Sequence, residues 1–357
     1  MTKCSLPWTK FNVYSNHLFS CCISDYGSST MPFIGNISPL DLMSEGSLWN
    51  MWSSSPTYVL MRQRMQEGGF DLACRSIDYG ESHHFRCSFP HFDVDMKGGF
   101  ETRIQDENQK KAQESFLKGE TVVSHFPLEI EMRLNTNCNL DCEMCSQKPW
   151  RGEEYSLSSL MLDDLLDFFR YARQVMITGG EPTISDLFPL VKDSIKEAKG
   201  AKIFLITNGH KLCESVLDGG YEDCFSLINV SLDAGDEETY NVVRKNGDWR
   251  TVNSQISDFM KRKLNSIHLF ISCIVSGNNF QDLSSVVRNA YSIGVKHVTF
   301  SEVHSLDSVM DGEKLEKWRS HLLYPSMLEN SLNQALSIGK DNGMRIDYSI
   351  PSISRFG

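Results

Sequence analysis

The chain beyond residue 126 alternates between short runs rich in Val and Ile and amphipathic stretches with helical spacing. This alternation is typical of parallel strands joined by crossover helices, which cover the faces of the sheet. Six strand-type runs are expected, which fits an α/β fold with a partial (β/α)6 TIM-type barrel rather than a closed eight-stranded one. A helix is expected over 158–171, and Ser185 is expected to cap the next helix. The expected strands, the third with its turn, cover residues 128–134, 174–178, 201–209, 227–233, 267–275 and 297–300.

A loop with three cysteines leaves the C-terminal end of the first expected strand. Cys138, Cys142 and Cys145 have the spacing CxxxCxxC. Three thiolates on one short loop can hold three irons of a [4Fe-4S] cube and leave the fourth iron without a protein ligand. Zinc is the alternative, but it favours paired CxxC knuckles closed by a fourth Cys or His, and no such partner follows at the expected distance. The spacing therefore predicts an iron-sulfur centre with an open coordination position.

A glycine-rich segment, Thr178-Gly179-Gly180-Glu181-Pro182, ends the second expected strand. Glycines let a backbone approach a ligand closely, and the carboxylate of Glu181 can meet an ammonium group. A plain turn between strand and helix is the alternative. Together with the cysteine loop, this segment resembles the radical S-adenosylmethionine (SAM) superfamily, in which it holds the amino group of SAM. One departure is Met144, which stands where that superfamily usually has an aromatic residue.

Further segments resemble the same superfamily core. Residues 207–209 resemble its TNG turn, and 231–233 resemble its SLD signature, whose Ser and Asp lie where they can meet the ribose hydroxyls or the carboxylate of SAM. Arg244 falls where many relatives carry an Arg whose guanidinium can bind the SAM carboxylate through two hydrogen bonds. Residues 276–279 occupy the turn that lies on the adenine side of SAM in this superfamily. An ordinary Asn-Gly turn and a surface Arg on a helix are the alternatives. The SAM-binding residues that the resemblance implies are Gly179, Gly180, Glu181, Ser231, Asp233 and Arg244.

A second group of cysteines precedes the predicted barrel. Its order, with a Pro-Trp pair, a Cys-Cys pair and the spacing Leu48 to Trp52, resembles the auxiliary iron-sulfur modules called SPASM or twitch domains, which usually follow the barrel. Those modules close with Cys-x-x-Cys, but position 77 is Ile. Either Cys87 is the fourth ligand, or the auxiliary cluster keeps an open iron. A structural zinc on the same residues is the alternative. The implied ligands are Cys4, Cys21, Cys74 and Cys87.

The same observations suggest how the chain is divided. Apolar residues at helical spacing between 313 and 342, interrupted near Pro325, are expected to pack against the barrel. The segment 106–118 is expected to form a solvated helix within a charged linker. The expected parts are a small Cys-rich α+β auxiliary domain over 1–95, the linker over 96–125, the barrel over 126–306, and C-terminal helices with a strand over 307–357.

Composition limits the partners of this chain. Its 35 basic and 46 acidic residues give a net charge of -11, which argues against broad contact with nucleic acid or anionic membranes. No apolar run approaches the roughly 20 residues of a membrane span, and the N-terminus does not resemble a signal peptide. A cytoplasmic location is therefore expected. In a reducing compartment most cysteines bind metal or lie buried, and isolated buried thiols are expected for Cys213, Cys224 and Cys273.

The resemblance implies a radical SAM oxidoreductase or maturase. In such enzymes the open iron chelates SAM, and an external donor such as flavodoxin or ferredoxin supplies one electron. The electron breaks a carbon-sulfur bond of SAM and releases methionine and a 5'-deoxyadenosyl radical, which takes a hydrogen atom from the substrate. Relatives with SPASM or twitch modules modify ribosomally made peptides or act on sugars and aminocyclitols, and peptide modification is the leading expectation. A sugar or aminocyclitol dehydrogenase or epimerase and a non-catalytic iron-sulfur or zinc scaffold are the alternatives.

Overall fold

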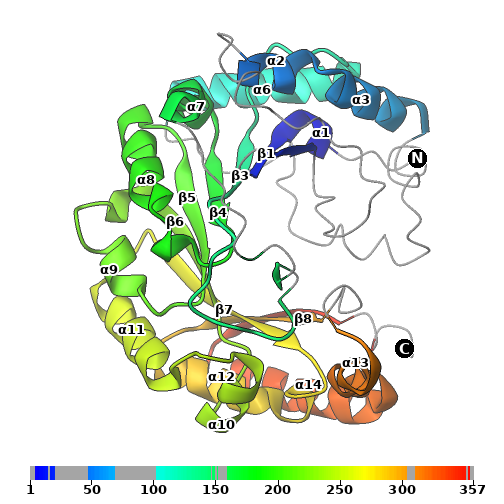
Figure 1. Cartoon of the computed structure of the whole chain (residues 1–357), viewed down its shortest axis with the longest axis vertical. Coiled ribbons are helices and arrows are strands. Elements are labelled where there is room, and N and C mark those ends of the chain that lie inside the picture. Colours follow the sequence, from blue (N-terminus) through cyan, green and yellow to red (C-terminus); the bar gives the residue numbers. More distant parts are fainter. Residues whose placement is uncertain are drawn as a thin grey trace. The chain divides into compact units, whose positions relative to one another are not determined.

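The computed structural model describes residues 5–14, 17–20, 47–68, 102–145, 147–148, 151, 159–303, 310–350 and 353 (Figure 1). The chain folds into two compact units, each built from segments that are separated in the sequence. Unit 1 comprises residues 1–135, 154–179 and 185–204, and unit 2 comprises 136–153, 180–184 and 205–357.

The strands of unit 1 run in the order β2-β1-β3-β4-β5, of which β5 contributes its first half. β1 pairs with β2 in antiparallel fashion and with β3 in parallel, and β3 and β4 are parallel. The pairing of β1 with β3 places part of residues 1–95 in the same sheet as the first expected barrel strand, which the sequence did not indicate. The strands are β1 (Lys10–Tyr14), β2 (His17–Ser20), β3 (Glu129–Arg133), β4 (Gln174–Thr178) and β5 (Lys202–Thr207).

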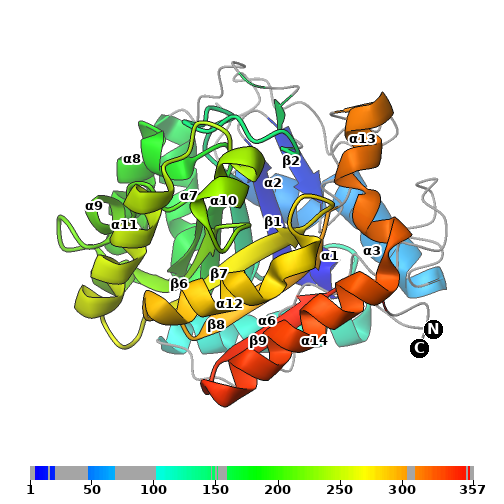
Figure 2. The ribbon, with the colours of Figure 1, turned by 90° about the horizontal axis from the view of Figure 1, so that it is seen from below.

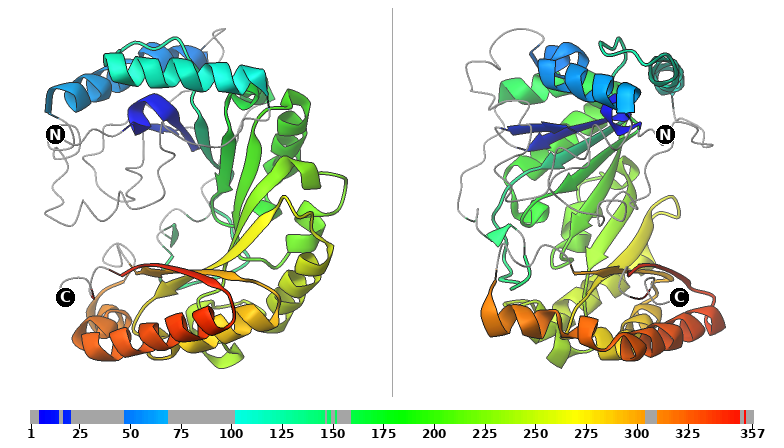
Figure 3. Two further views of the ribbon diagram at one scale, coloured as in Figure 1. Left: turned by 180° about the vertical axis from the view of Figure 1, so that it is seen from behind. Right: turned by 90° about the vertical axis from the view of Figure 1, so that its right-hand side faces the viewer.

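The helices of unit 1 include α6, which forms in the segment expected to be a charged linker. Thr102 caps it by accepting a hydrogen bond from Gln105 N, and Gly119 ends it in a left-handed conformation. One face is buried rather than solvated, because Gln105 and Asn108 donate to backbone carbonyls at the end of α7. Figure 3 shows α2, α3 and α6 on the same side of β1. The helices are α1 (Leu6–Thr9), α2 (Ser47–Ser54), α3 (Pro56–Gly68), α6 (Arg103–Lys118), α7 (Ser159–Tyr171) and α8 (Leu187–Ala198).

A buried arginine joins the first helices of unit 1. The Arg62 guanidinium donates hydrogen bonds to the carbonyl oxygens of Pro7, Trp52, Ser53 and Thr121. Burial lowers the pKa of Arg62 to about 10, which leaves the group charged at neutral pH. The carbonyls at the ends of α1 and α2 are thereby satisfied by a side chain instead of by water.

Unit 2 contains the second half of β5 and the parallel strands β6 (Phe225–Ser231), β7 (His268–Val275), β8 (His297–Glu302) and β9 (Arg345–Ser349). Figures 1 and 2 show α12 and α14 side by side on one face of β7 and β8. The helical elements are η3 (Pro182–Ile184), α9 (Leu212–Val216), η4 (Glu222–Cys224), α10 (Glu237–Val243), α11 (Trp249–Arg262), η5 (Phe280–Asp282), α12 (Leu283–Ser292), α13 (Gly312–Trp318), η7 (Ser320–Leu323) and α14 (Pro325–Asp341).

The expected α/β class is confirmed, because the six expected strands form as β3 to β8 and are separated by helices. Side chains alternate along these strands as a sheet covered by helices requires. On β6, Ile228 and Val230 are fully buried while Ser231 is half-buried. The expected cap at Ser185 was wrong by one residue, since Asp186 occupies the cap position of α8. The Ser185 hydroxyl still accepts a hydrogen bond from Leu187 N, across residue 186.

The C-terminal helices pack largely as expected. Trp318, Leu328 and Leu332 are buried. Leu322 and Leu323 belong to the apolar residues between 313 and 342 that were expected to pack, but they are 45% and 74% exposed. Residues 320–323 form the 3-10 helix η7, which has three residues per turn. The side chains of Leu322 and Leu323 therefore do not continue the apolar face that α-helical spacing would give. None of the helices within the described ranges has the length and apolar character that a membrane span requires. The domain boundaries stay a prediction, because most of residues 1–95 lies outside the described ranges.

Candidate functional site

The cysteine loop, residues 136–145, follows β3 and lies in unit 2. Cys142 is buried, Cys138 and Cys145 are partly exposed, and all three are free thiols. Leu140 N donates to Cys138 Sγ at 3.4 Å. Burial raises the pKa of Cys138 and raises that of Cys142 to about 11. Metal binding must therefore displace protons from these thiols.

The donor set of the cysteine loop fits an iron-sulfur cluster. Three thiols lie within eight residues, and amide groups donate toward one of the sulfurs, as is common around such clusters. Over the described ranges, no three or more Cys, His, Asp or Glu side chains are grouped to hold a single metal ion. The ligands of a cube each bind a different iron and need not meet at one point. Residues 138, 142 and 145 would hold the cluster, and their role as ligands stays a prediction.

Gly179 and Gly180, which follow β4, lie against the backbone that leads into the cysteine loop. A Cβ atom at Gly180 would lie 2.0 Å from Asn137 O, and one at Gly179 would lie 2.6 Å from Asn135 O. Gly179 also has a φ of +140°, which L side chains rarely adopt. Glu181 N donates to Asn137 O at 2.7 Å. What approaches the glycines most closely is therefore the backbone of residues 135–137, so any side chain at 180 would displace it.

The Glu181 carboxylate is buried and accepts hydrogen bonds from three neighbouring residues. Oε1 accepts from the hydroxyls of Thr183 and Thr207 at 2.6 and 2.7 Å, and Oε2 accepts from Asn208 N at 2.7 Å. Burial raises the pKa of Glu181, although these hydrogen bonds oppose the shift. The observed contacts give Glu181 a positioning role, because it ties residues 180–184 to the turn after β5. Its contact with an ammonium group stays a prediction.

Asn208 connects that turn to the cysteine loop. Its side-chain amide donates to Asn139 Oδ1 at 2.8 Å and lies 3.9 Å from Cys138 Sγ. Its Oδ1 accepts from the backbone N of His210. The TNG pattern pointed to this segment, but an ordinary Asn-Gly turn explains the sequence equally well. The contact with Cys138 makes Asn208 a site residue that sequence alone did not assign.

Asp233 and Arg244 form an ion pair inside unit 2. Arg244 Nε and Nη2 lie 2.7 and 2.5 Å from Asp233 Oδ2, and the Arg244 and Asp233 side chains are 11% and 0% exposed. Asp233 has a φ of +58° and also accepts from Ile274 N through Oδ1 at 2.7 Å. Burial opposes the charge on Arg244, but the pKa of Arg244 is raised because Asp233 outweighs this effect. Arg244 is therefore not the surface arginine of the alternative interpretation. Its contact with a SAM carboxylate stays a prediction.

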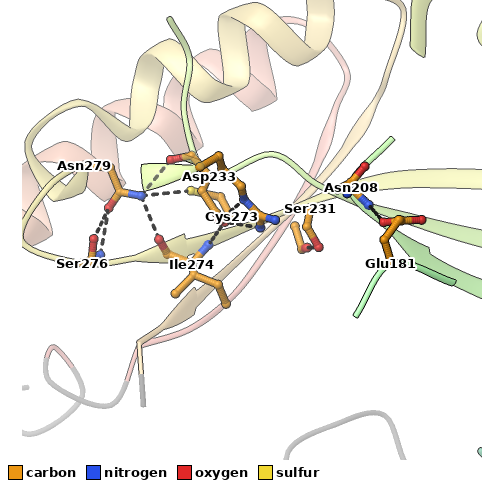
Figure 4. Close-up of polar contacts among 10 residues, drawn as sticks. Glu181, Asn208, Ser231, Asp233, Cys273, Ile274, Ser276 and Asn279 are labelled. Atoms are coloured by element: carbon orange, nitrogen blue, oxygen red, sulfur yellow. Dashed lines mark hydrogen bonds and ion pairs between the residues drawn. The ribbon is translucent and has the colours of Figure 1, made fainter. Parts of the chain in front are cut away.

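The turn at 276–279 is joined to Asp233 by an asparagine that sequence alone did not assign (Figure 4). Asn279 Nδ2 donates to Asp233 O at 2.9 Å and to Ile274 O at 2.7 Å, and its Oδ1 accepts from Ser276 N. Ser231 is half-buried on β6, and its hydroxyl lies 3.5 Å from that of Ser272 on β7. Figure 4 shows Glu181 and Asn208 joined at the end of another strand. The predicted cofactor-binding residues of unit 2 thus come from several strand ends.

The remaining cysteines fall into two sets. Cys213, Cys224 and Cys273 are buried, as expected. Burial raises the pKa of Cys213 and Cys273, which fits unreactive core residues. The predicted auxiliary ligands Cys4, Cys21, Cys74 and Cys87 lie outside the described residues, so their role stays a prediction.

Comparison with known proteins gives one family. Residues 132–290 match the model of the Radical SAM superfamily. A GTP 3',8-cyclase of Psychromonas ingrahamii is 24% identical over 248 residues, which cover 66% of this chain and 71% of that protein. A tungsten-containing aldehyde ferredoxin oxidoreductase cofactor-modifying protein of Pyrococcus furiosus is 28% identical over 51% of this chain and 54% of its own length. A probable GTP 3',8-cyclase of Thermoplasma volcanium is 30% identical over 32% of this chain and 36% of its own length.

Solved structures share the fold. A structure of histidine-tagged anSMEcpe with bound AdoMet has a TM-score of 0.51 and 20% identity, and the match covers 62% of this chain and 63% of that one. A structure of native anSMEcpe with bound AdoMet and Kp18Cys peptide has a TM-score of 0.50 with the same identity and coverage. At this identity the likeness concerns the fold alone. The chain spans less than two thirds of the length of either solved chain.

Proposed function

We propose that residues 132–290, which match the Radical SAM superfamily model, form a radical SAM domain. This chain then cleaves SAM reductively and abstracts a hydrogen atom from its substrate. The cofactors of that superfamily are a [4Fe-4S] cluster and SAM. One observation carries the proposal: Glu181 and Asn208 join the Gly-Gly-Glu-Pro segment, the turn after β5 and Cys138 in one network. Three segments far apart in sequence are thereby assembled around one potential cluster ligand.

The chain's own residues supply positioning and charge. Cys138, Cys142 and Cys145 would hold the cluster, and when it is bound with SAM the pair supplies one-electron cleavage of a carbon-sulfur bond and a hydrogen-abstracting radical. Asp233 keeps Arg244 charged and fixed near the end of β6, where a guanidinium suits a carboxylate. The network around Glu181 keeps the Gly-Gly backbone in place against the cysteine loop.

The proposed substrate is a ribosomally made peptide, and the proposed setting is the cytoplasm with an external electron donor such as flavodoxin or ferredoxin. The peptide expectation comes from the resemblance of the N-terminal cysteines to SPASM or twitch modules, and a solved structure of similar fold was determined with a bound peptide. A nucleotide is a second candidate, because several curated relatives are GTP 3',8-cyclases. An auxiliary cluster on Cys4, Cys21, Cys74 and Cys87 belongs to the same proposal.

The experiment that tests this proposal uses the full chain, reconstituted anaerobically with iron and sulfide. With dithionite and SAM, the protein should yield 5'-deoxyadenosine, and changing Cys138, Cys142 and Cys145 together to Ala should abolish the product. Iron counting should give about eight irons per chain for two cubes and about four for one. A protein with full iron content and bound SAM that forms no 5'-deoxyadenosine would contradict the proposal.

Deuterated substrates separate the two candidate substrate classes. Transfer of deuterium from a peptide into 5'-deoxyadenosine would support the maturase, and transfer from GTP would support the nucleotide candidate. A matched control is the triple Ala variant, which should transfer no deuterium from either substrate.

A further inference from the structure

Trp318, the last residue of α13, lies in an apolar cluster next to the cysteine loop. Its side chain is 2% exposed and packs with Val243 and Met310, and Met144 of the cysteine loop packs against this cluster. The sequence suggested only that Trp318 packs against the barrel. Its contacts instead reach segments that belong to the proposed SAM site, all of them within unit 2.

The indole of Trp318 holds the cysteine loop through a charged acceptor. Its Nε1 donates to Glu143 Oε2 at 3.3 Å, and Glu143 stands between Cys142 and Cys145 in the sequence. Lys245 and Lys314 also pair with the Glu143 carboxylate. Trp318 therefore donates to a carboxylate, which makes a stronger hydrogen bond than a neutral acceptor does.

The backbone of Trp318 holds the turn at 276–279. Gly277 N donates to Trp318 O at 2.7 Å. A Cβ atom at Gly277 would lie 2.0 Å from Lys317 O, so the turn lies directly against the end of α13. Asn279 of the same turn donates to Asp233 O. The end of α13 is thus linked through this turn to the Asp233–Arg244 ion pair.

Together with the Asp233–Arg244 ion pair, these contacts form a closed circuit of hydrogen-bonded residues within unit 2. From Arg244 the chain passes to Lys245, whose carbonyl accepts from Asp141 N of the cysteine loop at 2.9 Å. We propose that Trp318 is a positioning residue that holds the cysteine loop and the turn at 276–279 in register for SAM. This inference rests on the proposed function. It assigns α13 to the SAM-binding machinery.

The test measures SAM binding to the anaerobically reconstituted full chain. The variants are Trp318→Phe, which keeps the apolar packing and removes the donor, Glu143→Ala, and the double variant. Trp49→Phe is the matched control, because Trp49 lies on α2 in unit 1 and packs there against Phe126. The readouts are iron content, the SAM dissociation constant by equilibrium dialysis, and the EPR spectrum of the reduced cluster with and without SAM.

Trp318→Phe should keep its iron but bind SAM about tenfold more weakly, the usual effect of losing a group that orients a metal site. Excess SAM should restore the wild-type EPR spectrum, which a general loss of structure would not allow. The double variant should bind SAM about as weakly as Glu143→Ala alone, because that change already removes the acceptor of the Trp318 indole. Trp49→Phe should bind SAM like the wild type.

Wild-type SAM affinity in Trp318→Phe would overturn the inference and leave the proposed function intact. Additive losses in the double variant would also overturn it. If Trp318→Phe fails to fold by circular dichroism, Glu143→Ala decides: unchanged SAM affinity overturns the inference, and a tenfold loss that excess SAM rescues supports it. Wild-type protein with full iron content that binds no SAM would overturn the proposed function and this inference with it.

Discussion

Arg244 places two nitrogens on the same carboxylate oxygen of Asp233, and the second oxygen of Asp233 accepts from Ile274 N. An aspartate at a left-handed φ of +58° thus fixes an arginine that lies eleven residues later. Because both side chains are shielded from water, each needs the other as a partner for its charge.

Removing one charge from this pair should destabilise unit 2. Asp233→Asn keeps the shape and tolerates the left-handed backbone, but it leaves Arg244 buried without its counter-charge. We expect a loss of about 3–5 kcal/mol in the free energy of unfolding, measured by urea denaturation at pH 7. Asp218→Asn, which breaks the exposed pair with Arg262, serves as the control and should change little. Equal stability of Asp233→Asn and wild type would contradict this account.

The close approach at Gly180 predicts a specific effect on cluster loading. Gly180→Ala places a methyl group where Asn137 O now lies, so the chain entering the cysteine loop must move. We expect a stability loss of about 1–3 kcal/mol and reduced iron content after reconstitution. Gly343→Asn is a suitable control, because a side chain there meets open space and Asn accepts its left-handed φ of +61°. Full iron content in Gly180→Ala would refute the proposed packing role.

Asn208 should influence the cluster through Cys138. Asn208→Ala removes the amide donor near Cys138 Sγ and the hydrogen bond to Asn139. Donors near cluster sulfurs stabilise the reduced, more negative state, so the midpoint potential should become more negative in an EPR-monitored redox titration. Iron affinity should fall about tenfold. Asn253→Ala, whose side chain on α11 hydrogen-bonds to Trp249 O and to Asn289, should leave both values unchanged. An unchanged potential in Asn208→Ala would count against the contact.

Buried His125 predicts a pH dependence of stability in unit 1. Burial lowers the pKa of His125 to about 4, below its ordinary value near 6.5. The unfolded chain binds this proton at higher pH than the folded one, so the stability is fully present above pH 6.5 and falls as pH drops toward 4. The loss should reach about 3 kcal/mol. In His125→Gln the unfolding free energy should fall less steeply over this window; identical slopes for variant and wild type would exclude His125 as the cause.

The sequence predicted those features that depend on local pattern. The strand at Gln174–Thr178 has the expected bounds, because an uninterrupted apolar run is bounded by a polar turn and a Gly-Gly pair. The buried state of Cys213, Cys224 and Cys273 was predicted as well, since isolated cysteines in strands and helices usually lie in the core.

Contacts between distant segments could not be predicted in this way. Trp318 and Glu143 are 175 residues apart, and helical periodicity shows only that Trp318 faces the core. Arg244 and Asp233 were each expected to contact SAM, but nothing in their spacing shows that they pair with one another. The exposure of Leu323 depends on the switch from α-helical to 3-10 geometry before Pro325, which the apolar pattern does not reveal.

Cys138, Cys142 and Cys145 are proposed to hold a cluster whose open iron binds SAM. EPR spectroscopy of the dithionite-reduced full chain, recorded with and without SAM, tests this proposal most directly. SAM should change the spectrum of the reduced [4Fe-4S] cluster, and the variant with all three cysteines changed to Ala should lack the SAM-sensitive signal. A fully loaded wild-type cluster with a spectrum that SAM leaves unchanged would show that SAM does not bind its open iron.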